Sequence, residues 1–129
     1  MGLGVGLEVG DDLARLQGRW RQVAGEADGV ASTGDEYGAV GALVTTFTGT
    51  HFVVHHDDGR VVLEGDFEID SWANTIDWID SIGPDAGKRL PAIYRLAGET
   101  FVFVAADGER PRSFTTTAGQ VMRSFVRLK

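Results

Sequence analysis

Eight apolar runs of strand length, separated by turn residues, constrain this sequence more than any other feature. The runs are rich in β-branched and aromatic residues, which favour extended backbone. They are Arg19–Ala24, Ala42–Thr48, Thr50–His56, Arg60–Ile69, Thr75–Ile79, Ala92–Leu96, Thr100–Ala105 and Val121–Leu128. Eight strands suffice to close an all-β, antiparallel up-and-down barrel around side chains or one small ligand. A two-sheet sandwich allows the same periodicity and is the alternative.

The run Arg60–Ile69 shows the clearest alternation of apolar and polar residues. One face carries Val61, Leu63, Gly65, Phe67 and Ile69. The other carries Arg60, Glu64, Asp66, Glu68 and Asp70, with Val62 as the exception. Successive side chains of a strand point to opposite faces, so this strand has one buried face and one wet face. That division is typical of an antiparallel sheet with a single core. Small inward residues at Gly65, Ala92 and Ala105 would leave room inside such a barrel.

A short helix is predicted just before the first strand. Asp11 or Asp12 can cap its N-terminus, and Leu13 and Leu16 share one helix face. Gly18 ends the helix. Trp20 then opens the first strand, where we expect it to fill the closed end of the barrel.

The domain organisation follows from length and composition. Residues 1–10 are expected to be a flexible leader, and residues 11–129 a single domain large enough to bury a core. The segment Met1–Gly10 lacks a basic region followed by an apolar stretch, so we expect no signal peptide, no membrane span and a cytoplasmic location. The loop Ala27–Gly41 is polar and glycine-rich, and is a candidate lid.

Charge and cysteine content exclude several functions. The net charge is −7 and the basic residues are scattered, which argues against binding to nucleic acid or to an anionic membrane. The absence of cysteine excludes disulfides and thiolate metal sites. Hydrolase elbows, phosphate-binding loops and dinucleotide fingerprints are absent from the sequence as well. No cofactor is expected.

Four ordered motifs resemble those of a family of small lipocalin-like domains of unknown function, abundant in planctomycetes and also found in actinobacteria. They are Leu16-Gln17-Gly18-Arg19-Trp20, Phe67-Glu68-Ile69-Asp70 with Thr75-Ile76-Asp77, Ile93-Tyr94-x-Leu96-x-Gly98, and Glu109-Arg110-Pro111-x-x-Phe114. The sequence departs from the family at Ala92, where glycine is usual, and at Val102-Phe103-Val104, which replaces a strand that more often contains cysteine. The resemblance implies a lipocalin-like barrel and implies little about activity, because fold does not fix function.

The aromatic residues are candidates for core or for a ligand pocket. Aromatic side chains dominate the lining of apolar pockets. The candidate ligand contacts are Trp78, Tyr37, Phe52, Phe67, Phe101 and Phe103, together with Arg95. The hydroxyl groups of Tyr37 and Tyr94 can each donate a hydrogen bond to a ligand carbonyl.

Three residues are candidate catalytic groups: Tyr94, Asp77 and His55. Asp77 lies between Ile76 and Trp78, so alternation either turns it to water or, with the opposite parity, turns it into the cavity near Arg95 or Arg110. A buried carboxylate must be paired or shift its pKa. An inward histidine could act as a general acid or base.

A metal site built on the histidines is disfavoured. His51 and His55 share a face but lie about 13 Å apart along one strand, at roughly 3.3 Å per residue. His55 and His56 point to opposite faces, so one strand cannot supply tetrahedral ligands.

Three functions remain. The first is binding of one hydrophobic or amphipathic small molecule in the barrel cavity. The second is a cofactor-independent cyclase or isomerase of natural-product biosynthesis in the same cavity, performing a pericyclic, polyketide or terpenoid-type cyclisation by proximity and orientation. The third is a structural barrel with a packed interior.

Overall fold

The protein is described by a computed structural model covering residues 12–128, apart from residues 33, 36, 37, 40 and 84. The predicted leader and Tyr37 therefore lie outside the described residues, as does part of the candidate lid. Short strands occupy what is described of that segment: β2 (Val30–Ser32), β3 (Gly34–Asp35) and β4 (Gly38–Ala39).

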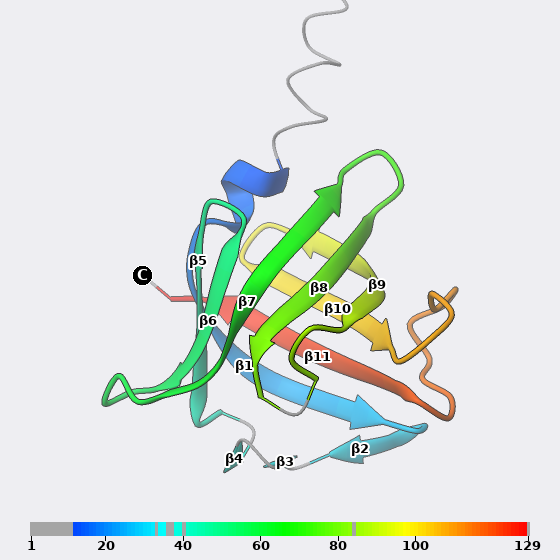
Figure 1. Ribbon diagram of the computed structural model, residues 1–129, viewed down its shortest axis with the longest axis horizontal. Helices are drawn as coiled ribbons and strands as arrows, with labels where there is room; N and C mark the ends of the chain where they lie inside the picture. Colours follow the sequence, from blue (N-terminus) through cyan, green and yellow to red (C-terminus); the bar gives the residue numbers. More distant parts are fainter. Residues whose placement is uncertain (1–11, 33, 36–37, 40, 84, 129) are drawn as a thin grey trace, which may run out of the picture.

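The described chain forms a closed antiparallel barrel (Figure 1). Its strands are β1 (Gly18–Ala27), β5 (Leu43–Thr48), β6 (His51–His56), β7 (Val61–Asp70), β8 (Thr75–Ile82), β9 (Arg89–Ala97), β10 (Thr100–Ala106) and β11 (Gln120–Arg127). Each pairs with its neighbours in up-and-down order, and β1 pairs with β11 to close the cylinder. The predicted eight-stranded lipocalin-like barrel is confirmed, and each predicted run corresponds to one of these strands.

A single helical turn, residues 12–16, lies over one end of the barrel (Figure 1). Leu16 is fully buried, and the Trp20 indole nitrogen donates a 2.8 Å hydrogen bond to the Leu16 carbonyl. The Arg127 guanidinium covers the Trp20 ring at 4.3 Å from its centroid. Trp20 therefore fills the closed end, as the sequence predicts, and ties the helix to β1 and β11.

The interior near the helix is densely packed with aromatic rings. Phe47 meets Phe67 and Phe101 edge-on, with ring centroids 5.4 and 6.1 Å apart. Such T-shaped contacts favour the ring quadrupoles and bury large apolar areas. These three side chains are at most 3% exposed and form a layer across the barrel.

One glycine allows a close backbone approach between neighbouring strands. A Cβ added at Gly65 of β7 would lie 2.3 Å from the Ile79 carbonyl oxygen of β8. The pairing of β7 with β8 shifts register at this point, between Glu64 and Gly65. Gly65 is buried, but β8 backbone occupies the space its side chain would have taken. Gly65 therefore adds no space for a ligand, although the sequence predicts that small inward residues leave room in the barrel.

Candidate functional site

The end of the barrel opposite the helix is hollow. Within the described residues, a cavity of about 340 Å³ lies there and opens outward. Its mouth is bordered by Ala27 at the end of β1, Asp85 before β9, Asp107 after β10 and Gly119 before β11. The barrel is thus packed in one half and open in the other.

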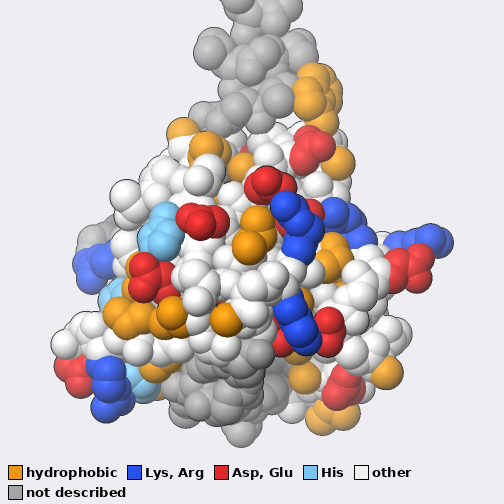
Figure 2. All heavy atoms as spheres, in the orientation of Figure 1, with side chains coloured by type: hydrophobic (Ala, Val, Ile, Leu, Met, Phe, Trp, Pro, Cys, Tyr) orange, Lys and Arg blue, Asp and Glu red, His pale blue; other side chains and the backbone are white. Residues whose placement is uncertain are grey.

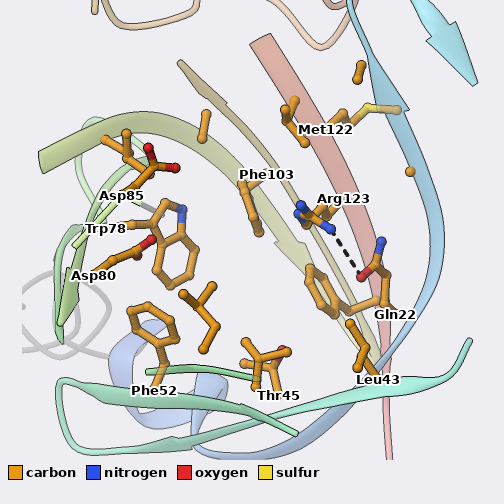
Figure 3. Close-up of a pocket in the computed structure, with 18 of the residues that line it drawn as sticks. Gln22, Leu43, Thr45, Phe52, Trp78, Asp80, Asp85, Phe103, Met122 and Arg123 are labelled. Carbon is orange, nitrogen blue, oxygen red and sulfur yellow. Dashed lines mark hydrogen bonds between the residues drawn. The ribbon is translucent and has the colours of Figure 1, made fainter. Parts of the chain in front are cut away.

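Aromatic side chains from five strands contribute to the cavity wall, and Figure 3 labels three of them, Phe52, Trp78 and Phe103. The five side chains are Phe47 of β5, Phe52 of β6, Trp78 of β8, Phe103 of β10 and Phe125 of β11. Trp78 stands at the centre of this wall, with ring centroids 5.2 Å from Phe52 and 4.9 Å from Phe103. Leu43, Val54, Leu63, Leu90 and Ala105 add aliphatic surface.

Asp80 places a carboxylate in this apolar wall. It follows Trp78 by two residues on β8, so the alternation of the strand turns both inward. Its exposure is 4%, and no hydrogen bond from the described residues reaches its carboxylate. Burial, and secondarily the charge of Asp85, raise the pKa of Asp80 to about 6, against a smaller opposing effect of Arg123.

Arg123 and Gln22 form a polar group on the other side of the cavity. The Arg123 guanidinium donates to the Gln22 side-chain oxygen at 3.5 Å. Figure 3 draws this pair on β11 and β1, with Asp80 beyond Trp78 on the opposite side. The cavity thus offers donors on one wall and an acidic acceptor on another.

The indole nitrogen of Trp78 is buried without a hydrogen-bond partner among the described residues. Leaving a buried donor unpaired costs about 1–3 kcal/mol. In Figure 3 the nitrogen-bearing edge of Trp78 faces the side of the cavity where Asp85 is drawn. An acceptor atom on a bound molecule would satisfy this group.

Carboxylates predominate at the cavity mouth. The Lys88 ammonium lies 3.5 Å from both Asp85 and Asp107 and bridges them. Glu26 accepts hydrogen bonds from the Thr116 hydroxyl and backbone nitrogen, and these bonds lower its pKa. On the face shown in Figure 2, Lys and Arg side chains lie among Asp and Glu side chains and do not form a separate basic patch.

Three of the predicted ligand contacts line the cavity: Trp78, Phe52 and Phe103. Phe67 and Phe101 point into the barrel but lie in the packed aromatic layer, outside the cavity lining. Tyr37 lies outside the described residues. Of the small inward residues, Ala105 borders the cavity, whereas Ala92 is buried in the packed half.

Tyr94 is buried beneath the helix and does not line the cavity. Its hydroxyl donates a 2.5 Å hydrogen bond to the Asp12 carboxylate. Burial, reinforced by Asp12, raises the pKa of Tyr94 above its usual value. This predicted catalytic residue thus joins the helix to β9.

Asp77, His55 and Arg95 lie on the outside of the barrel. Asp77 accepts hydrogen bonds from Arg110 at 2.6 Å and Arg89 at 3.0 Å. Burial alone would raise the pKa of Asp77, but these two guanidinium groups outweigh it and leave the pKa below its usual value. Asp77 is therefore paired with two guanidinium groups on the outer face of β8, with the outward parity that Ile76 and Trp78 predict.

His55 and Arg95 contact neighbouring surface groups. His55 Nε2 lies 3.0 Å from the Thr46 hydroxyl, and Nδ1 lies 2.8 Å from the His56 carbonyl oxygen. Arg95 covers the Phe114 ring at 4.3 Å from its centroid. Neither residue belongs to the cavity lining.

Sequence reasoning missed Asp80, Arg123 and Gln22. The signal for Asp80 was available, because it continues the inward series of Ile76 and Trp78. The predicted strand ended at Ile79, whereas β8 extends to Ile82. Arg123 lies two residues before the inward Phe125 on β11, so alternation turns its side chain inward as well.

The described residues contain neither a candidate metal site nor a helix that could span a membrane. No group of three or more histidine and acidic side chains there has the arrangement to hold a metal ion. In the same part of the chain, no helix has the length and apolar character needed to cross a bilayer.

Fold and site together define a closed, up-and-down, lipocalin-like β-barrel with an aromatic cavity open at one end. Comparisons of the chain with protein-family models, curated proteins and solved structures give no match.

Proposed function

We propose that the barrel binds one hydrophobic or amphipathic small molecule in its cavity. The observation that carries the proposal is the 340 Å³ space, walled by Phe52, Trp78 and Phe103, in a chain that packs the other half of its barrel tightly. A ligand that covers this wall gains about 25 cal/mol for each Å² of apolar surface removed from water.

The polar groups of the cavity support the same proposal. Asp80 and the Trp78 indole nitrogen are buried, and the described residues offer neither a hydrogen-bond partner. Ligand pockets typically combine an apolar lining with a few polar groups that fix orientation. A purely structural core of the same volume would gain stability by replacing Asp80 with an apolar side chain.

The binding proposal is tested with N-phenyl-1-naphthylamine, a neutral apolar dye whose fluorescence rises in apolar surroundings. We expect saturable binding at one site per chain. Ala105→Phe, which adds a ring to the cavity wall, should abolish binding. Val102→Phe is the matched control because it adds the same ring to β10 at a position outside the cavity lining. Absence of dye binding to the wild type, or equal binding by both variants, would contradict the proposal.

A cofactor-independent cyclase or isomerase is the second candidate function. The observation that favours it is Asp80, because a carboxyl group with a pKa near 6 can exchange a proton at neutral pH. The apolar wall would hold a flexible substrate in a reactive shape. Mass spectrometry of a cavity-bound polyene tests this candidate: conversion should require Asp80, and Asp80→Asn should bind the polyene without converting it. Recovery of unaltered polyene from the wild type would contradict it.

We propose as well that the chain belongs to the lipocalin-like family that its motifs resemble, and that the protein is cytoplasmic. The order of the four motifs in the sequence supports the first. The acidic, cysteine-free composition supports the second.

A further inference from the structure

The charges around the cavity discriminate between classes of ligand. Its lining contains four carboxylates, Glu26, Asp80, Asp85 and Asp107, and one guanidinium, Arg123. The chain as a whole carries a net charge of −7. The negative potential of the protein would therefore repel an anionic ligand such as a fatty acid and attract a cationic ligand.

Asp80 is the carboxylate placed to contact a ligand. Asp85 and Asp107 share Lys88 at the rim, and Glu26 accepts bonds from Thr116. Asp80 is 4% exposed, lines the cavity and accepts no hydrogen bond from the described residues. A buried carboxylate of this kind is stabilised by a cation that also donates a hydrogen bond.

The aromatic wall adds a second interaction for a cation. Trp78 stands directly beside Asp80 in Figure 3, and Phe52 and Phe103 pack on either side of Trp78. Aromatic faces attract ammonium groups by about 0.5–2 kcal/mol, and the attraction is stronger where water is excluded. The same faces contact the apolar body of a ligand.

We propose that the cavity selects apolar amines in their protonated form, with the ammonium group against Asp80 and the apolar body against Trp78, Phe52 and Phe103. This inference rests on the proposed binding function. Arg123 donates a hydrogen bond to Gln22 on the opposite side of the cavity from Asp80.

Three probes with one carbon skeleton test the selection: 4-phenylbutylamine, 4-phenylbutanol and 4-phenylbutyrate. Their affinities are measured at pH 8 by displacement of N-phenyl-1-naphthylamine and by calorimetry. At this pH Asp80 is ionised and the alkylamine is protonated. We expect the amine to bind about tenfold more tightly than the alcohol, as expected for one partly desolvated cation contact. The carboxylate should bind most weakly.

Asp80→Asn should remove the preference for the amine and leave the affinity of the alcohol unchanged. Glu109→Gln is the matched control because it also removes one negative charge, but from an exposed side chain outside the cavity. It should retain the amine preference. Equal affinities of amine and alcohol, or an amine preference that survives Asp80→Asn, would overturn the inference. Dye binding alone would then still support the binding function, whereas failure of the dye and all three probes would remove both proposals.

Discussion

Trp78 and Asp80 lie on the same inward face of β8, so an indole ring and a carboxylate share one wall of the cavity. Each carries a polar group that is buried and has no hydrogen-bond partner among the described residues. Asp77 lies on the opposite face of the strand and is paired with Arg110 and Arg89. A single strand thus carries a carboxylate paired on the outer surface and a second one that lines the cavity.

Asp80→Asn should stabilise the empty protein at neutral pH. Burial raises the pKa of Asp80 from 3.8 to about 6, so the folded state holds a proton that the unfolded state releases between these values. The stability of the wild type therefore falls relative to the variant as pH rises from about 4 to 6, and the deficit is fully present above pH 7. A shift of this size corresponds to about 2–3 kcal/mol.

Urea unfolding of both proteins at pH 5 and pH 7.5 measures this effect. The advantage of Asp80→Asn should be larger at pH 7.5. An advantage that is constant with pH, or a variant less stable than the wild type at pH 7.5, would show that the Asp80 carboxylate is well accommodated in the empty cavity.

Trp20→Phe should destabilise the fold more than Trp78→Phe. Both changes remove similar apolar area, but only Trp20 loses an indole hydrogen bond, the one to the Leu16 carbonyl. A buried hydrogen bond contributes about 1 kcal/mol, and the lost contact with Arg127 adds to the difference. Thermal unfolding compares the two variants. Equal losses of stability would mean that the Trp78 nitrogen is also paired.

Tyr94→Phe should loosen the helix without affecting the cavity. The hydroxyl bond to Asp12 joins β9 to residues 12–16, beside the hydrogen bond from Arg15 to the Leu96 carbonyl, and its removal should cost about 1 kcal/mol. Hydrogen exchange should accelerate in the helical turn, while N-phenyl-1-naphthylamine binds as to the wild type. Weakened dye binding with unchanged exchange would instead place Tyr94 at the binding site.

Gly65→Ala should be strongly destabilising. The added Cβ would overlap the Ile79 carbonyl, which is backbone and cannot turn away, and overpacking of this kind costs about 1–3 kcal/mol. Gly49→Ala is the control, since its Cβ meets open space and only its positive φ of 60° is unfavourable. If chemical denaturation shows that Gly65→Ala is as stable as Gly49→Ala, the backbones of β7 and β8 do not approach each other as closely at Gly65 as described.

His51 should add a small stability that disappears in alkaline solution. Hydrogen bonds to Asp66 and Glu64 raise its pKa above the usual 6.5. The folded state therefore favours the protonated ring, and the contribution is present below pH 6.5 and lost as pH rises through the raised pKa. All three side chains are partly exposed, so solvent screening limits the contribution to below about 1 kcal/mol. His51→Gln should remove this pH dependence, and an NMR titration of the imidazole that gives a pKa at or below 6.5 would contradict it.

Alternation along the strands made the barrel predictable, but it could not locate the cavity. The pattern correctly indicates that Phe67, Phe101, Phe103 and Trp78 point inward. Their depth depends on the register between strands and on the helix that fills one end, and neither is encoded in the period of two. Phe103 and Trp78 therefore line the cavity, while Phe67 and Phe101 lie in the packed layer.

The polar part of the site was missed for a related reason. A sequence pattern indicates the ends of a strand less clearly than its middle. β8 extends through Asp80, where Gly65 and the shifted register keep β8 paired with β7. Candidates chosen for chemical type alone, such as His55 and Asp77, lie on the outer surface. Residue type indicates what a side chain can do, but strand length and parity decide where it acts.

NMR of the tryptophan indole groups shows whether the cavity holds a small molecule. The chain has three tryptophans, whose signals are assigned with single Trp→Phe variants. Titration with N-phenyl-1-naphthylamine should move the Trp78 indole signal to saturation at one molecule per chain and leave that of Trp20, in the packed half, in place. A Trp78 signal that stays fixed while only that of the exposed Trp72 moves would contradict binding in the cavity.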